Sequence, residues 1–336
     1  MSEDTSRLSS GSVHQSDVEL VNKPRRRFAK VGVVAPVIMT LTSKVALGGT
    51  YQCTISGVQS GNTSNHSADM LQCGVGFSPG GWWSNADKTD GSPDGCLAQW
   101  LQACVNPFTL KTVKVDTKTD VETESYTISV RKKTLTKYKQ TTTVTTTTTT
   151  SVAGVSSAPV EGTPVTTVVD DLGSGSVGTT TNTTTVTKKY IIQNGEDVEN
   201  AAVYDVIATS KDCSGVTRGT GALATTFSSI FGVAPPGLNS NASMHEVLYY
   251  HQSGGGTLDF HAVADYLNAA FYAKTGYAAF ASVYADLSPG DIVGLYQIAI
   301  GNLTSFTSSS GAIVTSSFNG GVNGSGVKSF LVSIHH

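Results

Sequence analysis

Histidines and carboxylates gather in the last third of the sequence, and these residue types can move protons near neutral pH. The group comprises His245, His251, His261, Glu246, Asp259 and Asp265. A helix would place His245 and His251 on different faces, and His261 falls in a mostly apolar segment. No spacing in the group demands a catalytic pair or a metal site. We therefore expect these histidines to serve in the core or at helix ends, and we predict neither a metal nor a cofactor.

Three predicted helices must position these residues, and each carries end signals in the sequence. The first starts at Ser243, where Glu246 completes a capping box. The second starts after Thr257 and stops at Gly276, because glycine favours the left-handed conformation that ends many helices. The third starts at Ser288, which is followed by proline at the first helical position. Packed on one another, these helices are expected to form a small core.

Motifs for nucleophilic or phosphate chemistry are weak in this chain. The GSGSVG segment lacks the strand, elbow and helix that surround a nucleophilic serine. The SGGGT segment that ends at Thr257 offers backbone N–H groups to an anion, but a flexible linker is the commoner use of such a sequence. A secreted enzyme is therefore the least favoured of the functions considered for this protein.

A threonine-rich zone spans residues 111–194 and has almost no aliphatic bulk. Its densest part is TTTVTTTTTT, which starts at Thr141. From Val113 to Glu124, a row of valine and threonine alternates with a row of charged residues, and this period of two is typical of a β-strand. Threonine is β-branched and favours strands, so the zone is predicted to be ordered. The alternative is a disordered, glycosylated stalk.

Proline content favours the ordered alternative, because stalks of that kind are rich in proline. This zone contains only Pro159 and Pro164. We predict two long β-ribbon arms at 111–152 and 163–193. The chain is expected to turn at GVSSAPVEG, between the arms, and LGSGSVG is the candidate for a further turn. A two-stranded ribbon is only marginally stable alone, so it needs a sheet or a partner chain, and its open edges invite strand addition.

Five cysteines occur, and their spacing defines the candidate disulfides. Cys53 and Cys73 bracket a polar loop and are the first expected pair. Cys96 and Cys104 fall on one predicted helix, where about 12 Å of rise separates them, too far for a disulfide. One of the two, preferably Cys104, is expected to pair with Cys213. Cys96 is then either a buried free thiol or a link between chains.

An export signal is predicted in the first 48 residues. A basic stretch with Arg25, Arg26, Phe28 and Lys30 resembles the twin-arginine signal, and a short apolar run with a small-residue exit follows. Cleavage is expected after Gly48. The apolar run is at the lower limit for a bilayer span, so a retained anchor is the alternative. The sequence predicts export through the periplasm to the cell surface or the extracellular space, with membrane contact only through an uncleaved leader.

Two further segments carry a resemblance to a known family. The stretch SGNTSNH…CGVGFSPGGWW and the later stretches FSSIFG and HAVADYLNAAF resemble uncharacterised exported bacterial proteins with a Cys-bounded loop, a Ser-Pro-Gly-(Phe/Tyr)-Trp-Lys-Asn-His motif and a His-x-(Val/Leu)-Ala-Ala-x-Leu-Asn-Ala helix. The chain departs from this pattern after Trp82 and Trp83, where the lysine and the histidine are missing. The resemblance implies no activity, but it implies that the threonine-rich zone is inserted into a compact cysteine-bearing domain.

These features divide the chain into five zones and give a fold class. The zones are an export leader at 1–48, a Cys-rich loop and helix segment at 49–110, the β-ribbon insertion at 111–194, a helical segment at 195–301 that completes the domain, and a Ser/Gly-rich tail at 302–336. The tail carries two β-like runs, AIVTSSF and VKSFLVSI. The predicted fold class is α+β: a small disulfide-bonded helical domain with a long threonine-rich β-ribbon insertion and a short C-terminal β hairpin.

Composition narrows the functional classes. Charged residues make up 14% of the chain, against roughly 25% in average globular proteins, and the net charge is −3. No basic patch with interleaved aromatic residues occurs, so nucleic acid is not an expected partner. The leading hypothesis is a self-assembling extracellular protein, a filament or matrix subunit that associates with itself through β edges. The alternative is an adhesin or ligand-binding module with the ribbon as a spacer and with Trp82 and Trp83 as a ligand platform.

Overall fold

The computed structural model describes residues 76–89, 94–253, 256–316 and 324–334. All of them belong to one compact unit. The predicted export leader lies outside the described residues, as do Cys53, Cys73 and the loop between them. The described part contains both helices and strands, with one disulfide and a small C-terminal hairpin, so the coarse α+β prediction is confirmed.

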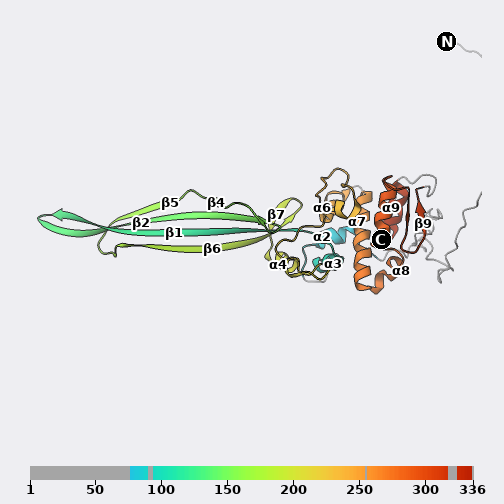
Figure 1. The fold of residues 1–336 in the computed structure, drawn as a ribbon, viewed down its shortest axis with the longest axis horizontal. Coiled ribbons are helices and arrows are strands. Elements are labelled where there is room, and N and C mark those ends of the chain that lie inside the picture. Colours follow the sequence, from blue (N-terminus) through green and yellow to red (C-terminus); the bar gives the residue numbers. More distant parts are fainter. Residues whose placement is uncertain (1–75, 90–93, 254–255, 317–323, 335–336) are drawn as a thin grey trace, which may run out of the picture. The chain divides into compact units, whose positions relative to one another are not determined.

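Helices from both sides of the threonine-rich zone come together, and we call them the helical domain (Figure 1). Before that zone come α2 (Pro79–Asn85) and α3 (Leu97–Gln102). After it come α4 (Ala201–Thr209), α5 (Phe227–Phe231), α6 (Met244–Tyr250), α7 (Leu258–Thr275), the 3-10 turn η4 (Ala278–Phe280), α8 (Ala281–Tyr284), α9 (Pro289–Ala299) and α10 (Gly324–Ile334). Because α2 and α3 contact α7, segments far apart in the sequence build one domain.

The three helices predicted from their end signals are confirmed. The Ser243 hydroxyl accepts from the Glu246 N–H, and the Glu246 carboxylate accepts from the Ser243 N–H, which completes the capping box of α6. α7 ends at Gly276, whose φ of 62° is left-handed. Ser288 caps α9, where Asp291 closes a second capping box.

The core of the helical domain is aromatic and surrounds α7, which contacts α2, α3, α6, α9 and α10. Its largest fully buried side chains are Trp82, Trp100, Tyr296, Phe108, Phe227, Phe231, Phe280 and Phe330. Burial of one such side chain contributes about 1.5–3 kcal/mol. Leu110 and Ile191 at the base of the sheet are also fully buried and lie opposite each other, so they anchor the sheet in this core.

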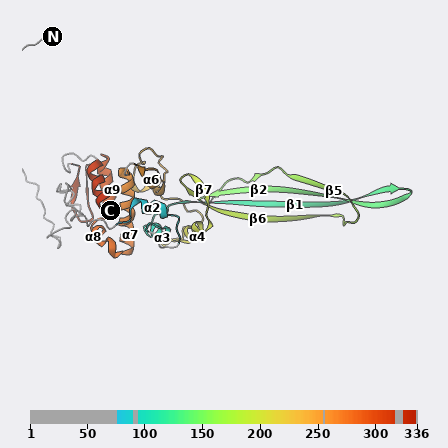
Figure 2. The same cartoon turned by 180° about the vertical axis from the view of Figure 1, so that it is seen from behind.

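The threonine-rich zone forms an antiparallel sheet that extends away from the helical domain (Figure 1, Figure 2). β1 (Thr109–Val130) lies between β2 (Lys133–Val152) and β6 (Gly178–Gln193). The outer side of β2 pairs with β3 (Val155–Ser156), β4 (Val160–Glu161) and β5 (Val165–Leu172). β7 (Glu196–Glu199) pairs with the base of β6. The strand order is therefore β5–β2–β1–β6 along the middle of β2, and β4 and β3 replace β5 on the outer side of β2 toward the helical domain.

The first predicted arm, 111–152, is itself a hairpin of β1 and β2. It turns at Arg131 and Lys132, whose φ angles of 51° and 64° are both left-handed. Two-residue turns of this kind usually carry Asn-Gly or Asp-Gly, so the sequence contains no signal for this one. The LGSGSVG segment carries the chain from β5 to β6, on the opposite edge of the sheet. It passes close to Tyr138, since a Cβ at Gly175 would lie 2.8 Å from the Tyr138 Cγ.

The C-terminal tail contains one short hairpin and a helix. β8 (Ser305–Thr307) pairs with β9 (Ile313–Thr315), which includes part of the predicted AIVTSSF strand. The prediction of a strand at VKSFLVSI is wrong, because these residues form α10. The helical period explains the difference: Val327, Phe330, Leu331 and Ile334 are buried together, and α10 packs against α7 and α9.

Candidate functional site

Two of the predicted histidines, His245 and His251, have different surroundings in the helical domain. His245 lies in the core, where its Nε2 donates to the Trp83 backbone oxygen over 3.1 Å and the ring of Phe108 packs against it at 4.9 Å. Burial lowers the pKa of His245 to about 4, so the ring is neutral at pH 7. The core position that the sequence favoured for this histidine is confirmed.

His251 and Asp259 form a close pair between two helices. His251 follows the last residue of α6, and its Nδ1 contacts the carboxylate of Asp259 in the first turn of α7. Burial, and then the charge of Asp259, raises the pKa of the Tyr296 hydroxyl. Among the described residues, no group of three or more His, Cys, Asp or Glu side chains is placed to hold a metal ion. His251 is the C-cap of α6 and contacts Asp259 in the first turn of α7, so it lies at a helix end, as the sequence favoured.

Asn268 links the two segments that carry the family resemblance, and the sequence did not single it out. Its Oδ1 accepts from the Phe77 N–H at 3.0 Å and from the Trp82 indole N–H at 3.1 Å. Its Nδ2 donates to the Phe77 carbonyl at 3.1 Å and to the Tyr284 hydroxyl at 3.2 Å. The Tyr284 hydroxyl in turn donates to Asp265 at 2.8 Å. Every group in this network is buried, so its role is to hold α2 against α7 and α8.

The same network corrects the prediction of a tryptophan platform. Trp82 is fully buried, because Asn268 binds its indole N–H and the ring packs edge-on to Trp100 at 5.5 Å. A buried ring has no free face for a ligand. Trp83 is half-buried and lies 5.8 Å from the ring of Tyr249, so only one of the two predicted tryptophans reaches the surface.

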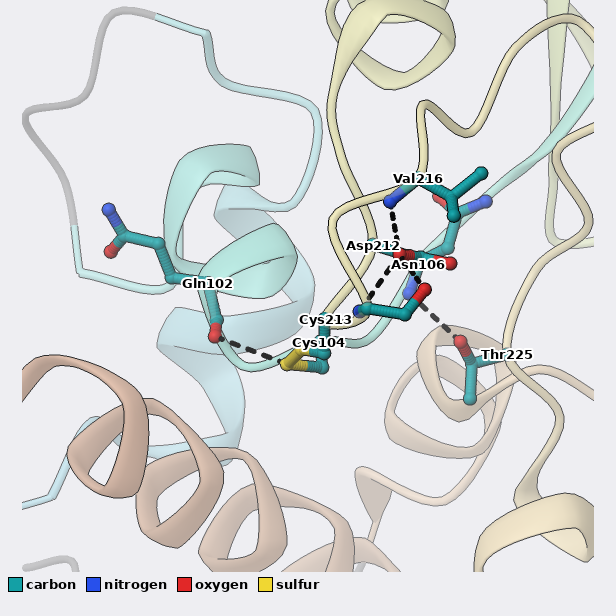
Figure 3. The surroundings of a disulfide bond; sticks show 8 residues. Gln102, Cys104, Asn106, Asp212, Cys213, Val216 and Thr225 are labelled. Carbon is teal, nitrogen blue, oxygen red and sulfur yellow. Dashed lines mark hydrogen bonds between the residues drawn. A yellow bond between two sulfur atoms is a disulfide. The ribbon is translucent and has the colours of Figure 1, made fainter.

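The Cys104–Cys213 disulfide joins the segment between α3 and β1 to the loop after α4, so it links the two sides of the threonine-rich zone (Figure 3). Cys104 follows the end of α3, and Cys213 lies in a loop where the Asp212 carboxylate accepts from the N–H groups of Ser214 and Val216. This pairing is the one that the sequence favoured. Cys96 is a buried free thiol that precedes α3, so the two cysteines do not share a helix as predicted.

The sheet has two unlike faces, which follow from its antiparallel register. One face carries only valine, threonine and other uncharged side chains over most of its length, and we call it the threonine–valine face; on β1 it runs from Val113 to Thr123 in steps of two. The opposite, charged face carries a row along β1 that consists of Lys114, Asp116, Lys118, Asp120, Glu122 and Glu124. The threonines of β2 and β6 flank this row on both sides.

Charges on the charged face are largely satisfied within the sheet. Asp116 accepts from the Thr185 hydroxyl at 2.5 Å and from Lys114 at 2.9 Å, and these hydrogen bonds lower its pKa. Asp120 lies 2.8 Å from Lys118 and accepts from the Thr181 hydroxyl, and both contacts lower its pKa. Asp116 and Asp120 therefore stay ionised and already have partners in the same chain.

The two long edges of the sheet differ in how well they are protected. All residues of β6 from Gly178 to Lys188 are exposed, and within the described part of the chain no strand pairs with the outer side of this stretch. From Gly178 to Thr187 the strand has no charge, no proline and no break in register with β1. The β5 edge follows Pro164, has a register shift at its pairing with Tyr138 and Gln140, and ends near two aspartates.

Comparison of the chain with known protein families, with characterised proteins and with solved structures finds no match. In the part of the chain that the structure describes, no helix has both the length and the apolar character that a bilayer crossing requires. The candidate site is the exposed sheet, which has an open edge at β6 and two unlike faces.

Proposed function

We propose that this protein is an exported structural component of the cell exterior that associates with copies of itself by strand addition through its sheet. The open edge of β6 is the observation that supports this proposal most. An edge strand presents unpaired N–H and C=O groups that can pair with a strand of another chain. In this sheet such groups extend along the exposed stretch from Gly178 to Lys188.

The exposure of the sheet's valines supports the same proposal. Val165 is 65% exposed, Val160 is 67% exposed and Val186 is 52% exposed. Away from its base at Leu110 and Ile191, the sheet buries few apolar side chains of its own. A sheet built in this way gains stability when another chain covers its edge or face.

Removal of the sheet tests the proposal. Lys111 and Tyr190 lie directly opposite each other in the β1–β6 ladder, so a two-residue Asn-Gly turn can join them in place of residues 112–189. This sheet-shortened variant keeps the buried Leu110–Ile191 pair and β7. Negative-stain electron microscopy is expected to show intact chains joined through their sheets and separate compact particles for the variant. Separate particles in both samples would overturn the proposal.

Export is a separate part of the proposal and rests on the leader sequence. We expect Arg25→Lys with Arg26→Lys to retain the protein inside the cell, because the twin-arginine route requires the arginine pair. Fractionation of producing cells measures this directly. Unchanged secretion of the variant would contradict the proposed route without affecting the assembly proposal.

A second candidate function, ligand binding, is favoured by an aromatic row on α2 and α6. Trp83 lies 5.8 Å from Tyr249, which lies 5.0 Å from Tyr250, and Tyr250 is 48% exposed. Rows of this kind can stack on sugar rings. The substitution Tyr250→Ala is expected to weaken binding to insoluble polysaccharide, whereas Tyr277→Ala at a similarly exposed tyrosine serves as the control. Equal binding by both variants and the parent would eliminate this candidate.

A further inference from the structure

We infer that the strand that adds to β6 is the β6 strand of a second copy, paired antiparallel about a two-fold axis near Thr183. This inference rests on the proposed function and deepens it, because it names the partner, the edge and the register. A β6 pair of this kind would join the sheets of the two copies into one continuous sheet.

The absence of protection on β6 points to this edge. Natural sheets block edge pairing with charges, prolines, bulges or short strands. β5 uses all of these devices: it is short, it follows Pro164, its register with β2 shifts, and Asp170 and Asp171 lie near its end. β6 uses none of them between Gly178 and Thr187. An edge left open over this length is expected to have a partner.

The length of the open stretch fits a second copy of itself. In a two-fold pairing centred on Thr183, Gly178 of one chain lies opposite Lys188 of the other. The pairing therefore ends just before Tyr190, where β7 begins to occupy the same side of β6. Thr181 then lies opposite Thr185, and Asn182 lies opposite Thr184. Cross-strand pairs of threonines and other small polar residues stabilise antiparallel strands.

The pairing also keeps the two faces of the sheet apart. Residues that lie opposite each other in this register have the same parity, so the threonine–valine faces of the two copies become continuous, as do the charged faces. The charged rows on the two β1 strands would be three strand spacings apart, about 14 Å. That separation exceeds the screening length of roughly 8–10 Å at ordinary ionic strength, so the rows do not oppose association.

Two-fold pairing would limit the size of the assembly. A contact of β6 with β6 uses both open edges at once, as isologous contacts do. The outer edges of the combined sheet would then lie beyond the two β2 strands, where β3, β4 and β5 pair. The product is a pair of chains with their helical domains at opposite ends of the sheet, and larger structures would have to grow through another surface.

Charge substitutions on the threonine–valine face of β6 test the edge and the register together. The variant Asn182→Lys with Thr184→Lys places lysines directly opposite lysines twice in the dimer. The variant Asn182→Lys with Thr184→Glu places opposite charges there instead. Thr166→Lys with Val168→Lys puts the same added charge on β5 as a control. We expect the first variant to weaken dimerisation roughly tenfold or more, and the other two to dimerise as the parent does.

Sedimentation velocity of the full chain measures these outcomes, with circular dichroism to establish that each variant is folded. An unfolded variant is replaced by its single-site form, Asn182→Lys or Thr184→Lys. A parent that associates while the β6 lysine variant associates equally well would overturn the inference and leave the proposed function standing. Loss of dimers with both the Lys/Lys and the Lys/Glu variants would overturn the register. A parent that sediments as a single chain would overturn the proposed function itself.

Discussion

Removal of the Cys104–Cys213 disulfide tests how strongly the ends of the threonine-rich zone are held together. We consider the double substitution Cys104→Ser with Cys213→Ser. Both residues are exposed, so their loss removes little packing. Cys104 has a left-handed φ of 67°, and serine in the same conformation is strained to a similar degree. The main consequence of the substitution is therefore the loss of the cross-link from the unfolded chain.

The size of the effect follows from the length of the loop that the disulfide closes. The two cysteines are 109 residues apart in the sequence. Chain-entropy theory gives about 4.8 kcal/mol at about 25 °C for a loop of this length, and measured losses run at roughly 2–5 kcal/mol. We expect the free energy of unfolding to fall by an amount in this range. The slope of that free energy against urea should rise, because the unfolded chain is no longer constrained.

Urea unfolding followed by tryptophan fluorescence measures both quantities, since Trp82 and Trp100 are fully buried in the folded helical domain. The single variant Cys104→Ser is the control, because it breaks the same bond and should match the double variant. If the free energy of unfolding falls by less than about 1 kcal/mol and its slope against urea is unchanged, the disulfide does not constrain the unfolded state as expected.

Three further predictions concern residues of the core and of the sheet. The free energy of unfolding should fall by on the order of 3 kcal/mol between pH 6.5 and pH 4. In this range His245 binds a proton in the unfolded state, whereas in the folded state its pKa is about 4 and the ring stays mostly neutral. His245→Phe should therefore flatten this part of the pH profile in urea unfolding. Arg131→Asn with Lys132→Gly should slow hydrogen exchange at the tip of the β1–β2 hairpin by stabilising it by about 1 kcal/mol, and equal or faster exchange would contradict the turn geometry. Asn268→Leu should destabilise the helical domain by about 3–5 kcal/mol in urea unfolding, because it leaves the Trp82 indole and the Phe77 backbone without partners. As a control, Asn302→Leu at an exposed position should change stability by less than about 0.5 kcal/mol.

Local signals in the sequence predicted the helix ends well. Ser243 with Glu246, Gly276 and Ser288 each act within one turn of backbone, so the chemistry that defines them is present in a few adjacent residues. The disulfide partner of Cys213 was also predictable from the sequence, because the choice lay between Cys96 and Cys104.

Features that depend on distant parts of the chain could not be predicted from local sequence signals. The Arg131–Lys132 turn carries no turn residue, and the strands on either side of it impose its left-handed backbone. The run VKSFLVSI fits a strand or a helix by composition, and contact with α7 and α9 decides between them. Trp82 is one of two adjacent tryptophans, and its burial depends on contacts with distant residues such as Asn268 and Trp100.

Sedimentation equilibrium of the purified intact chain, beside the sheet-shortened variant over the same concentrations, tests most directly whether the sheet joins copies of this protein. We expect the mass of the intact chain to rise with concentration to that of two chains, while the variant retains the mass of one. A single-chain mass for the intact protein at every concentration would show that the sheet does not join copies of this protein.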